Sequence, residues 1–347
     1  MKYVFQIHSN TNLITSLGVI SSKKLNHKNI LFILFRDLEI PLSISNEFAI
    51  VRLPNEIMQF DYFYVRKLYR FNWIKIKTII KVLDDFLLKH LTGSKFQFYC
   101  QNSRHYYLNM ISTHFNCVET FYVEESMDAY LSENVFNLKY SLELKWPYKI
   151  INILCLMFFS KRINQRIVLP NSAFEKRTLD DFYFFGLTKD SFKRYCPNEA
   201  IKVVDLVILP ELKIKDEKIY IICFSALEDQ GVLDSKTASN IYKEFLIKEN
   251  ITEKLYLKFH PFQSKQNRDV FLNTLNEFQF EVMPDNFILE KEFLNGYVNL
   301  ISIASSLLIY AKKLNSKNNV FPLYLCTKNK VSKKRFSIWN DALNEYL

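Results

Sequence analysis

A run of apolar residues without a polar interruption constrains the fold of this chain more than any other feature. The stretch "NILFILFR" at 29–36 predicts a strand that is buried on both faces, as the strands of parallel sheets are. It follows a strand signal at 2–8 and a helix signal at 11–20. The order strand, helix, strand is typical of a parallel sheet covered by helices, so the sequence predicts an α/β fold.

The same alternation continues through most of the chain. Further strands are expected at 49–54, 95–100, 119–125, 218–224, 254–261, 278–284, 296–303 and 321–326. Helical spacing of apolar residues marks 73–91, 239–250 and 269–278, whereas 160–215 has turn residues and no clean period. In a chain of 347 residues, this pattern predicts two Rossmann-like domains, 1–200 and 201–347, that face each other across a cleft.

The formal net charge of +10 favours an anionic partner, such as nucleic acid, anionic lipid or a nucleotide-activated substrate. Nucleic acid is not expected, because the sequence has no dense stripe of Lys and Arg with stacking aromatic residues. Ligands of open parallel sheets bind at the carboxyl ends of the strands. This rule selects the segments after "FYVEE", "IYIICF" and "LYLKF".

Cysteine usage and apolar segments indicate a cytoplasmic protein. The six cysteines form no CxxC pair, which argues against a disulfide scaffold or a zinc site. The N-terminal "MKYVFQIHSN" is typical of a strand and not of a signal peptide. The longest apolar run, 151–159, is too short to span a bilayer. It is expected to be a core helix or, alternatively, an interfacial helix that contacts the inner membrane peripherally.

Several common catalytic motifs are missing from the sequence. It contains no GxGxxG, GxxxxGK[ST], HExxH or GxSxG. It also contains no DxD, and "DLE" at 37–39 is a weak substitute. Sugar-nucleotide enzymes that depend on Mg²⁺ need such carboxylates to hold the metal on a diphosphate. We therefore expect neither a metal nor a cofactor.

The first candidate for chemistry is the pair His260-Pro261, at the end of the expected strand 254–261. A histidine at the carboxyl end of a parallel strand can act as a general acid, because its ordinary pKa lies near neutrality. Pro261 fixes its own backbone and biases His260 toward extended geometry. The alternative is a histidine that is merely hydrogen-bonded at a strand end.

Acidic residues follow two other expected strands. Glu124 and Glu125 come after "TFYV", and partial burial could raise the pKa of one of them enough to make it a base. Alternatively, the two carboxylates lie at the N-terminus of a helix, where the helix dipole favours negative charge. A rival acidic site, "EDQG" at 228–231, follows the strand 218–224 and contains Asp229.

Two further features suit a nucleotide. Ser305 and Ser306 precede an apolar helical run, and hydroxyls with free backbone N–H groups at a helix N-terminus form an anion site. Glu290 lies six residues after Pro284, and a carboxylate can accept both hydroxyls of a ribose. The alternatives are an ordinary helix cap and an ordinary surface glutamate.

Together these features resemble the bacterial sialyltransferases of the lipooligosaccharide sialyltransferase and capsular polysialyltransferase group. That group shares an acidic pair motif (D/E-D/E-G), an HP motif, a carboxylate six residues after a proline, and a downstream Ser-Ser. The matching positions, in the same order, are Glu124-Glu125-Ser126, His260-Pro261, Pro284 to Glu290, and Ser305-Ser306. The resemblance spans about residues 1–310, including the opening "FQIHSNTNLI", where it implies acceptor contacts from Asn10 and Thr11. Ser126 replaces the glycine of the motif.

The resemblance implies the GT-B architecture and an inverting, metal-independent transfer of sialic acid from CMP-N-acetylneuraminate to a hydroxyl of a surface glycan, either lipooligosaccharide or capsule. His260 would be the acid, and the base would be Glu125, Glu124 or Asp229. The residues implied to bind the donor are Pro261, Glu290, Ser305, Ser306 and Lys258. Lys258 alternatively lines a solvated edge.

Two alternatives to this function remain open. The first is the same chemistry with another CMP-linked donor, carrying pseudaminic, legionaminic or 3-deoxy-manno-octulosonic acid, because the motifs bind CMP and not the sugar tail. The second is a non-catalytic GT-B-like binding protein, which the departure at Ser126 would fit.

Overall fold

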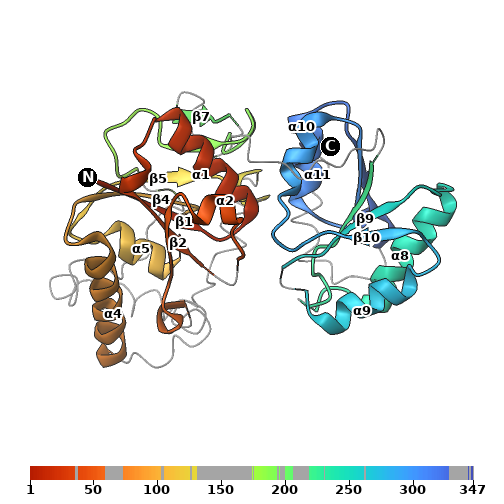
Figure 1. Cartoon of the computed structure of the whole chain (residues 1–347), viewed down its shortest axis with the longest axis horizontal. Coiled ribbons are helices and arrows are strands. Elements are labelled where there is room, and N and C mark those ends of the chain that lie inside the picture. The colour runs from red at the N-terminus through yellow and green to blue at the C-terminus, as the bar shows by residue number, and fades with distance from the viewer. Residues whose placement is uncertain are drawn as a thin grey trace, which may run out of the picture. The chain divides into compact units, whose positions relative to one another are not determined.

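The computed structural model divides the chain into two compact units, residues 1–207 and 208–347, called here the N-terminal and C-terminal units (Figure 1). The structure describes residues 1–35, 38–58, 73–102, 105–125, 127–130, 174, 176–193, 195, 200–205, 219–229, 231–261, 263–327, 343 and 345–346. The expected helix at 151–159 and Ser126 therefore lie outside the described residues.

The N-terminal unit is built on a seven-stranded parallel sheet with the order β3-β2-β1-β4-β5-β6-β7. Its strands are β1 (Lys2–Ile7), β2 (Ile30–Leu34), β3 (Ala49–Arg52), β4 (Phe96–Cys100), β5 (Cys117–Val123), β6 (Phe184–Gly186) and β7 (Ile201–Val203). Its helices are α1 (Asn10–Ser22), α2 (Leu42–Ser45), α4 (Trp73–Leu91) and α5 (Tyr106–Ser112), with 3-10 turns η1 (His27–Asn29) and η2 (Met127–Tyr130).

The core of this unit follows from its apolar strands. All of β2 is buried, as the continuous run predicts. On the face covered by α1, the Tyr99 ring stacks between those of Phe5 and Phe121, at centroid distances of 4.3 and 4.8 Å. Helix α1 approaches the chain closely at Gly18, where a Cβ atom would lie 2.7 Å from the Asp205 carbonyl oxygen. A glycine at this position is therefore required by the packing.

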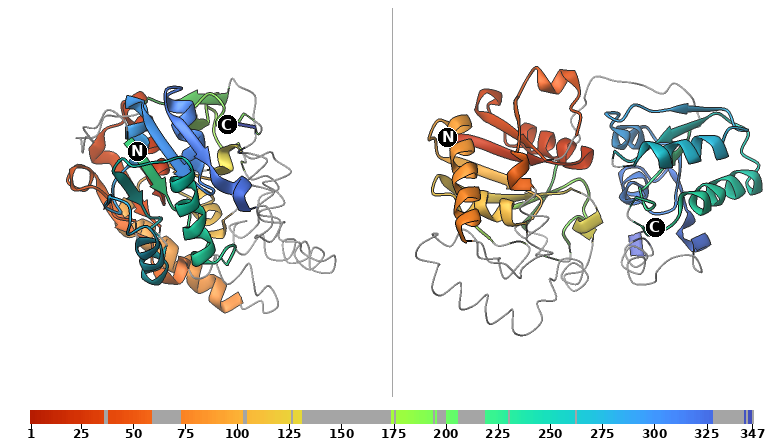
Figure 2. Two further views of the ribbon diagram at one scale, coloured as in Figure 1. Left: turned by 90° about the vertical axis from the view of Figure 1, so that its right-hand side faces the viewer. Right: turned by 90° about the horizontal axis from the view of Figure 1, so that it is seen from below.

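The C-terminal unit has a five-stranded parallel sheet with the order β10-β9-β8-β11-β12. Its strands are β8 (Ile219–Cys223), β9 (Leu255–Lys258), β10 (Phe280–Val282), β11 (Val298–Ser302) and β12 (Asn319–Pro322). Its helices are α8 (Ser235–Lys248), α9 (Lys265–Thr274), α10 (Glu292–Asn295) and α11 (Ser306–Leu314), with 3-10 turns η4 (Leu289–Lys291) and η5 (Leu323–Thr327). Helices α8 and α9 pack side by side on one face of the sheet, and α11 lies on the other (Figures 1 and 2).

The strand orders locate the switch point of each sheet. In the C-terminal unit the chain builds outward from β8 to β10 and then returns to add β11 on the other side of β8. In the N-terminal unit the same reversal separates β1 from β4. Ligands of such sheets bind at the carboxyl ends of the strands beside this reversal.

Most of the expected elements are confirmed, with ends that differ by a few residues. The strand expected at 321–326 is wrong: β12 ends at Pro322, and residues 323–327 form the 3-10 turn η5. Pro322 lacks the N–H that a continuing strand would donate. The short strands β6 and β7 lie in the segment 160–215, where no period was found, and β7 extends the N-terminal unit past residue 200. No helix in the described part of the chain is long and apolar enough to cross a membrane.

Candidate functional site

The carboxyl ends of three neighbouring strands carry the candidates in the C-terminal unit. β9 ends at Lys258 and leads to His260, β8 ends at Cys223, and β11 leads to Ser305. Neighbouring strands lie about 4.8 Å apart, so the ends of β9 and β11 are about 10 Å from each other. These strand ends lie at the switch point of the sheet, where ligands of such sheets bind.

Cys223, the last residue of β8, is paired in register with Lys258, the last residue of β9. Its sulfur lies 4.0 Å from the Ser305 hydroxyl oxygen. Burial raises the pKa of the Cys223 thiol to about 12; the Ser305 hydrogen bond and the charge of Lys258 oppose that rise, and the charge of Glu290 adds to it. The sheet register and the 4.0 Å contact therefore bring Lys258 and Ser305 to the end of β8, although the two are far apart in sequence.

The serine doublet begins helix α11. Ser305 is the N-cap residue, and its hydroxyl oxygen accepts a hydrogen bond from the backbone N–H of Leu307 at 3.2 Å. Ser306 is the first residue of the helix. The positive end of the helix dipole favours an anion at such a start, and here the Leu307 and Leu308 N–H groups donate to the hydroxyl and carbonyl oxygens of Ser305.

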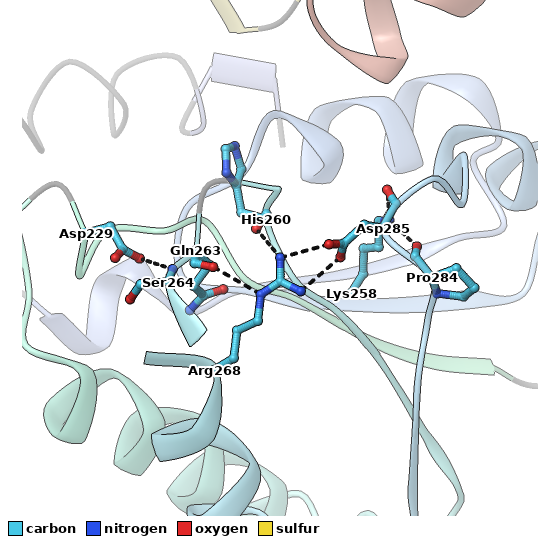
Figure 3. A network of polar contacts seen from close by, with 8 residues as sticks. All are labelled: Asp229, Lys258, His260, Gln263, Ser264, Arg268, Pro284 and Asp285. Carbon is cyan, nitrogen blue, oxygen red and sulfur yellow. Dashed lines mark hydrogen bonds and ion pairs between the residues drawn. The ribbon is translucent and has the colours of Figure 1, made fainter. Parts of the chain in front are cut away.

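His260 is fixed through its backbone. Its carbonyl oxygen accepts hydrogen bonds from the backbone N–H of Gln263 at 2.9 Å and from Nη2 of Arg268 at 3.3 Å. Figure 3 shows the imidazole pointing away from these contacts. Pro261 is exposed in the turn that follows. The prediction that this histidine follows the carboxyl end of a parallel strand is confirmed.

Lys258 is buried, which contradicts a place on a solvated edge. The residue is only 5% exposed. Its Nζ donates hydrogen bonds to the carbonyl oxygens of Pro284 at 2.6 Å and Asp285 at 2.8 Å (Figure 3). Burial lowers the pKa of this ammonium, against the opposing charges of Asp285 and Glu290. The lysine therefore holds the loop after β10, the loop that leads to Glu290.

Glu290 is also buried, at 3% exposure, in the turn η4. Its charge acts on both Lys258 and Cys223. An ordinary surface glutamate would be exposed, so the surface alternative for Glu290 is wrong.

The rival acidic site separates into two different carboxylates. Asp229 is exposed, and its Oδ2 accepts the backbone N–H of Ser264 at 3.2 Å, at the start of α9. Slight burial acts to raise the pKa of Asp229, but hydrogen bonds from Ser264 and Asn267 outweigh it, so the pKa is lowered. Glu228 is half-buried and accepts a hydrogen bond from Nε2 of Gln263 at 3.3 Å. Burial raises the pKa of Glu228 to about 7, and the charge of Asp229 contributes to the rise.

The acidic pair of the N-terminal unit also divides. Glu124 is fully buried, and its Oε2 accepts hydrogen bonds from the backbone N–H of Leu187 and the hydroxyl of Ser191, both at 2.6 Å. Burial, with the charge of Glu124, raises the pKa of the Tyr130 phenol well above its ordinary value. Glu124 is thus engaged in holding the loop after β6.

Glu125 lies beside the turn that follows β1. Its Oε1 is 3.2 Å from Nδ1 of His8, and its backbone oxygen accepts the Ser9 hydroxyl at 2.9 Å. Asn10 and Thr11 form the start of α1 next to this contact, with Asn10 half-buried and Thr11 buried. Sequence reasoning missed His8, although its position after an apolar strand was the available signal.

Among the described residues, no group of three or more His, Cys, Asp or Glu side chains could hold a metal ion. The donor candidates gather in the C-terminal unit, and the candidates Glu124, Glu125, Asn10 and Thr11 gather in the N-terminal unit.

Comparison with known proteins shows the fold. No protein-family model matches the sequence, and no curated protein does. MnaA from S. aureus, solved with UDP, is 12% identical with a TM-score of 0.51, over 96% of this chain and 82% of that one. A candidate UDP-N-acetylglucosamine 2-epimerase from Listeria monocytogenes is 9% identical with a TM-score of 0.51, over 99% and 87%.

A third match is an α/β-galactoside α-2,3-sialyltransferase from Photobacterium phosphoreum, 14% identical with a TM-score of 0.43, over 99% of this chain and 96% of that one. The fold is the two-domain α/β type with parallel sheets called GT-B, which confirms the predicted fold class.

Proposed function

We propose that this protein is an inverting, metal-independent glycosyltransferase that moves sialic acid from CMP-N-acetylneuraminate to a hydroxyl of a bacterial surface glycan, either lipooligosaccharide or capsule. The observation that carries the proposal is that Lys258 and Ser305 meet at Cys223, the end of β8, while His260 follows the neighbouring strand β9. Lys258 also holds the loop that leads to the buried Glu290. A protein of the same fold was solved with UDP, which agrees with a nucleotide ligand.

The base in this proposal is Glu125. Its carboxylate would take the proton of the acceptor hydroxyl, and His8, 3.2 Å away, would orient it. Glu124 and Asp229 are weaker candidates, because the first holds a buried loop and the second receives hydrogen bonds at the start of α9. Asn10 and Thr11, next to Glu125, would contact the acceptor.

The groups proposed to act on the leaving group belong to the C-terminal unit. The acceptor oxygen forms a bond to the anomeric carbon while the bond from that carbon to the CMP oxygen breaks, with inversion. His260 gives its proton to the departing phosphate oxygen, and Ser305 and Ser306 bind the phosphate at the start of α11. Such contacts contribute about 3 kcal/mol of transition-state stabilisation. Glu290 would accept the ribose hydroxyls, and Pro261 would keep His260 extended.

The first test measures CMP release from CMP-N-acetylneuraminate, with and without lactose as acceptor. We expect acceptor-dependent release that EDTA does not reduce. His260→Ala should lower turnover by about 10²–10⁴-fold while CMP binding, measured by calorimetry, is retained. His27→Ala, which changes an exposed histidine of the N-terminal unit, is the matched control and should leave turnover unchanged. Wild-type turnover in His260→Ala would refute the acid role.

The second test compares Glu125→Gln, Glu124→Gln and Asp229→Asn. Loss of transfer with an unchanged circular dichroism spectrum identifies the base. Retention of transfer in Glu125→Gln would contradict our assignment, and loss in one of the other two variants would move the role to that residue.

Other substrates separate the alternatives. Turnover with CMP-pseudaminate or CMP-3-deoxy-manno-octulosonate, but not with CMP-N-acetylneuraminate, would keep the chemistry and change the donor. CMP binding without turnover of any donor would indicate a binding protein. Because the fold is shared with the Listeria protein named above, UDP-N-acetylglucosamine is also tested, and its 2-epimerisation would overturn the proposal.

We also propose that the protein is cytoplasmic and contacts the inner membrane peripherally. The net charge of +10 agrees with an anionic donor, acceptor and membrane surface. Co-sedimentation with vesicles that contain phosphatidylglycerol, but not with vesicles of phosphatidylcholine alone, is the expected result. Equal recovery in the supernatant with both would remove the membrane contact from the proposal.

A further inference from the structure

Arg268, on helix α9, joins three segments of the C-terminal unit. Its Nε donates to the carbonyl oxygen of Gln263 at 3.1 Å, and its Nη2 donates to that of His260 at 3.3 Å. Its two terminal nitrogens also bind the two carboxylate oxygens of Asp285, each at 3.1 Å (Figure 3). One guanidinium thus connects the turn after β9, the loop after β10 and α9.

The geometry of these contacts fixes direction as well as distance. A guanidinium that binds both oxygens of a carboxylate is held in one plane, unlike a lysine ammonium, which is a point charge. The guanidinium also lies over the Phe259 ring, 5.4 Å from its centroid. Phe259 directly precedes His260, so Arg268 contacts both the side chain before His260 and the carbonyl oxygen of His260 itself.

The loop that carries Asp285 is tied to the same strand end by a second cation. Lys258 donates to the carbonyl oxygens of Pro284 and Asp285, and the segment that follows leads to Glu290. The position of the His260 turn and the position of the Glu290 segment are therefore coupled through Asp285.

The Arg268 and Asp285 side chains are 23% and 42% exposed, so solvent screens part of their attraction. Their bidentate geometry also fixes orientation, which a catalytic group needs because it must be held close to its productive position.

We propose that Arg268 is a positioning residue: by binding Asp285 and the His260 carbonyl, it aims the imidazole at the phosphate of the same nucleotide whose ribose Glu290 holds. The inference rests on the proposed function, because it assigns the imidazole a role in the transfer. In this proposal Arg268 acts through His260 and does not itself contact the substrate.

A double-mutant cycle tests this role, with CMP release from CMP-N-acetylneuraminate as the readout. Arg268→Gln should lower kcat by about 10–100-fold and change the KM for the donor by less than about threefold. In the His260→Ala background, the same substitution should cost less than about twofold, because the group that it positions is gone. The control Lys243→Met breaks a surface ion pair with Glu277 in the same unit and should leave kcat unchanged.

The outcomes distinguish the two proposals. Unchanged kcat in Arg268→Gln, or an equal loss in both backgrounds, would overturn the positioning role while leaving the proposed function intact. Full turnover in His260→Ala alone would instead refute the acid role of the proposed function.

A second measurement does not depend on turnover. In ¹⁵N-labelled protein, the imidazole signals that vanish in His260→Ala belong to His260. Arg268→Gln is expected to shift or broaden these signals, and Lys243→Met is expected to leave them unchanged. If the His260 imidazole signals stay unchanged in Arg268→Gln, the positioning role is overturned. This result does not require that the protein turns over a CMP-sugar.

Discussion

Glu228 makes the stability of the C-terminal unit depend on pH near neutrality. Burial raises the pKa of its carboxyl group from its ordinary 4.5 to about 7. Between these two values the folded chain keeps a proton that the unfolded chain has released. The free energy of unfolding therefore falls as the pH rises from 4.5 to 7, and then stays level.

The size of the effect follows from the shift. One pKa unit corresponds to about 1.4 kcal/mol, so the shift from 4.5 to about 7 corresponds to about 3.5 kcal/mol at most. Because the side chain is only half-buried, solvent screens part of this cost, and we expect roughly 1.5–3 kcal/mol. Glu228→Gln cannot ionise and should be more stable than the wild type by that amount at pH 8, with little advantage at pH 4.5.

Urea unfolding followed by circular dichroism at pH 4.5, 6 and 8 measures this difference. Glu277→Gln, which changes a glutamate that is 47% exposed in the same unit, is the control for a change of net charge. A gap between wild type and Glu228→Gln that is the same at all three pH values would refute the reasoning.

Further substitutions test packing and hydrogen bonding by urea unfolding. Glu124→Ala should cost about 3 kcal/mol, because two buried donors lose their acceptor, and an unchanged midpoint would contradict the role of Glu124 in holding the loop after β6. Lys258→Met should cost about 2–4 kcal/mol, because the carbonyl oxygens of Pro284 and Asp285 lose their donor, and a wild-type midpoint would show that water replaces it. Gly18→Ala should cost about 1–3 kcal/mol through overlap with the Asp205 carbonyl, and no loss would mean that α1 can move away freely.

The sequence predicts the strands that hold the site because parallel strands leave a strong signal. Runs such as that of β2 must be apolar on both faces, and the polar residues that follow such runs must lie at the sheet edge. This reasoning placed His260 after β9 and Ser305 before α11 without any tertiary information. It failed for β6 and β7, because strands of three residues are too short to show a period.

The division of Glu124 from Glu125 could not be predicted. The two residues are adjacent and chemically identical, and their surroundings are decided by Ser191 in one case and His8 in the other. The roles of Lys258 and Arg268 were hidden for a related reason. Both bind backbone carbonyl oxygens, which every residue carries, so no residue type marks the acceptor in the sequence.

The hydroxyl of Ser305 caps helix α11 and is also proposed to bind a phosphate, and a substitution can keep the first role while it removes the second. Its oxygen stabilises the helix start through Leu307, a task that aspartate performs equally well. An aspartate there would bring a permanent negative charge to the place where a phosphate is proposed to arrive. Ser305→Asp should therefore yield a protein that folds as well as the wild type and repels the proposed CMP ligand, so that selecting variants for thermal stability alone would not detect the loss of binding.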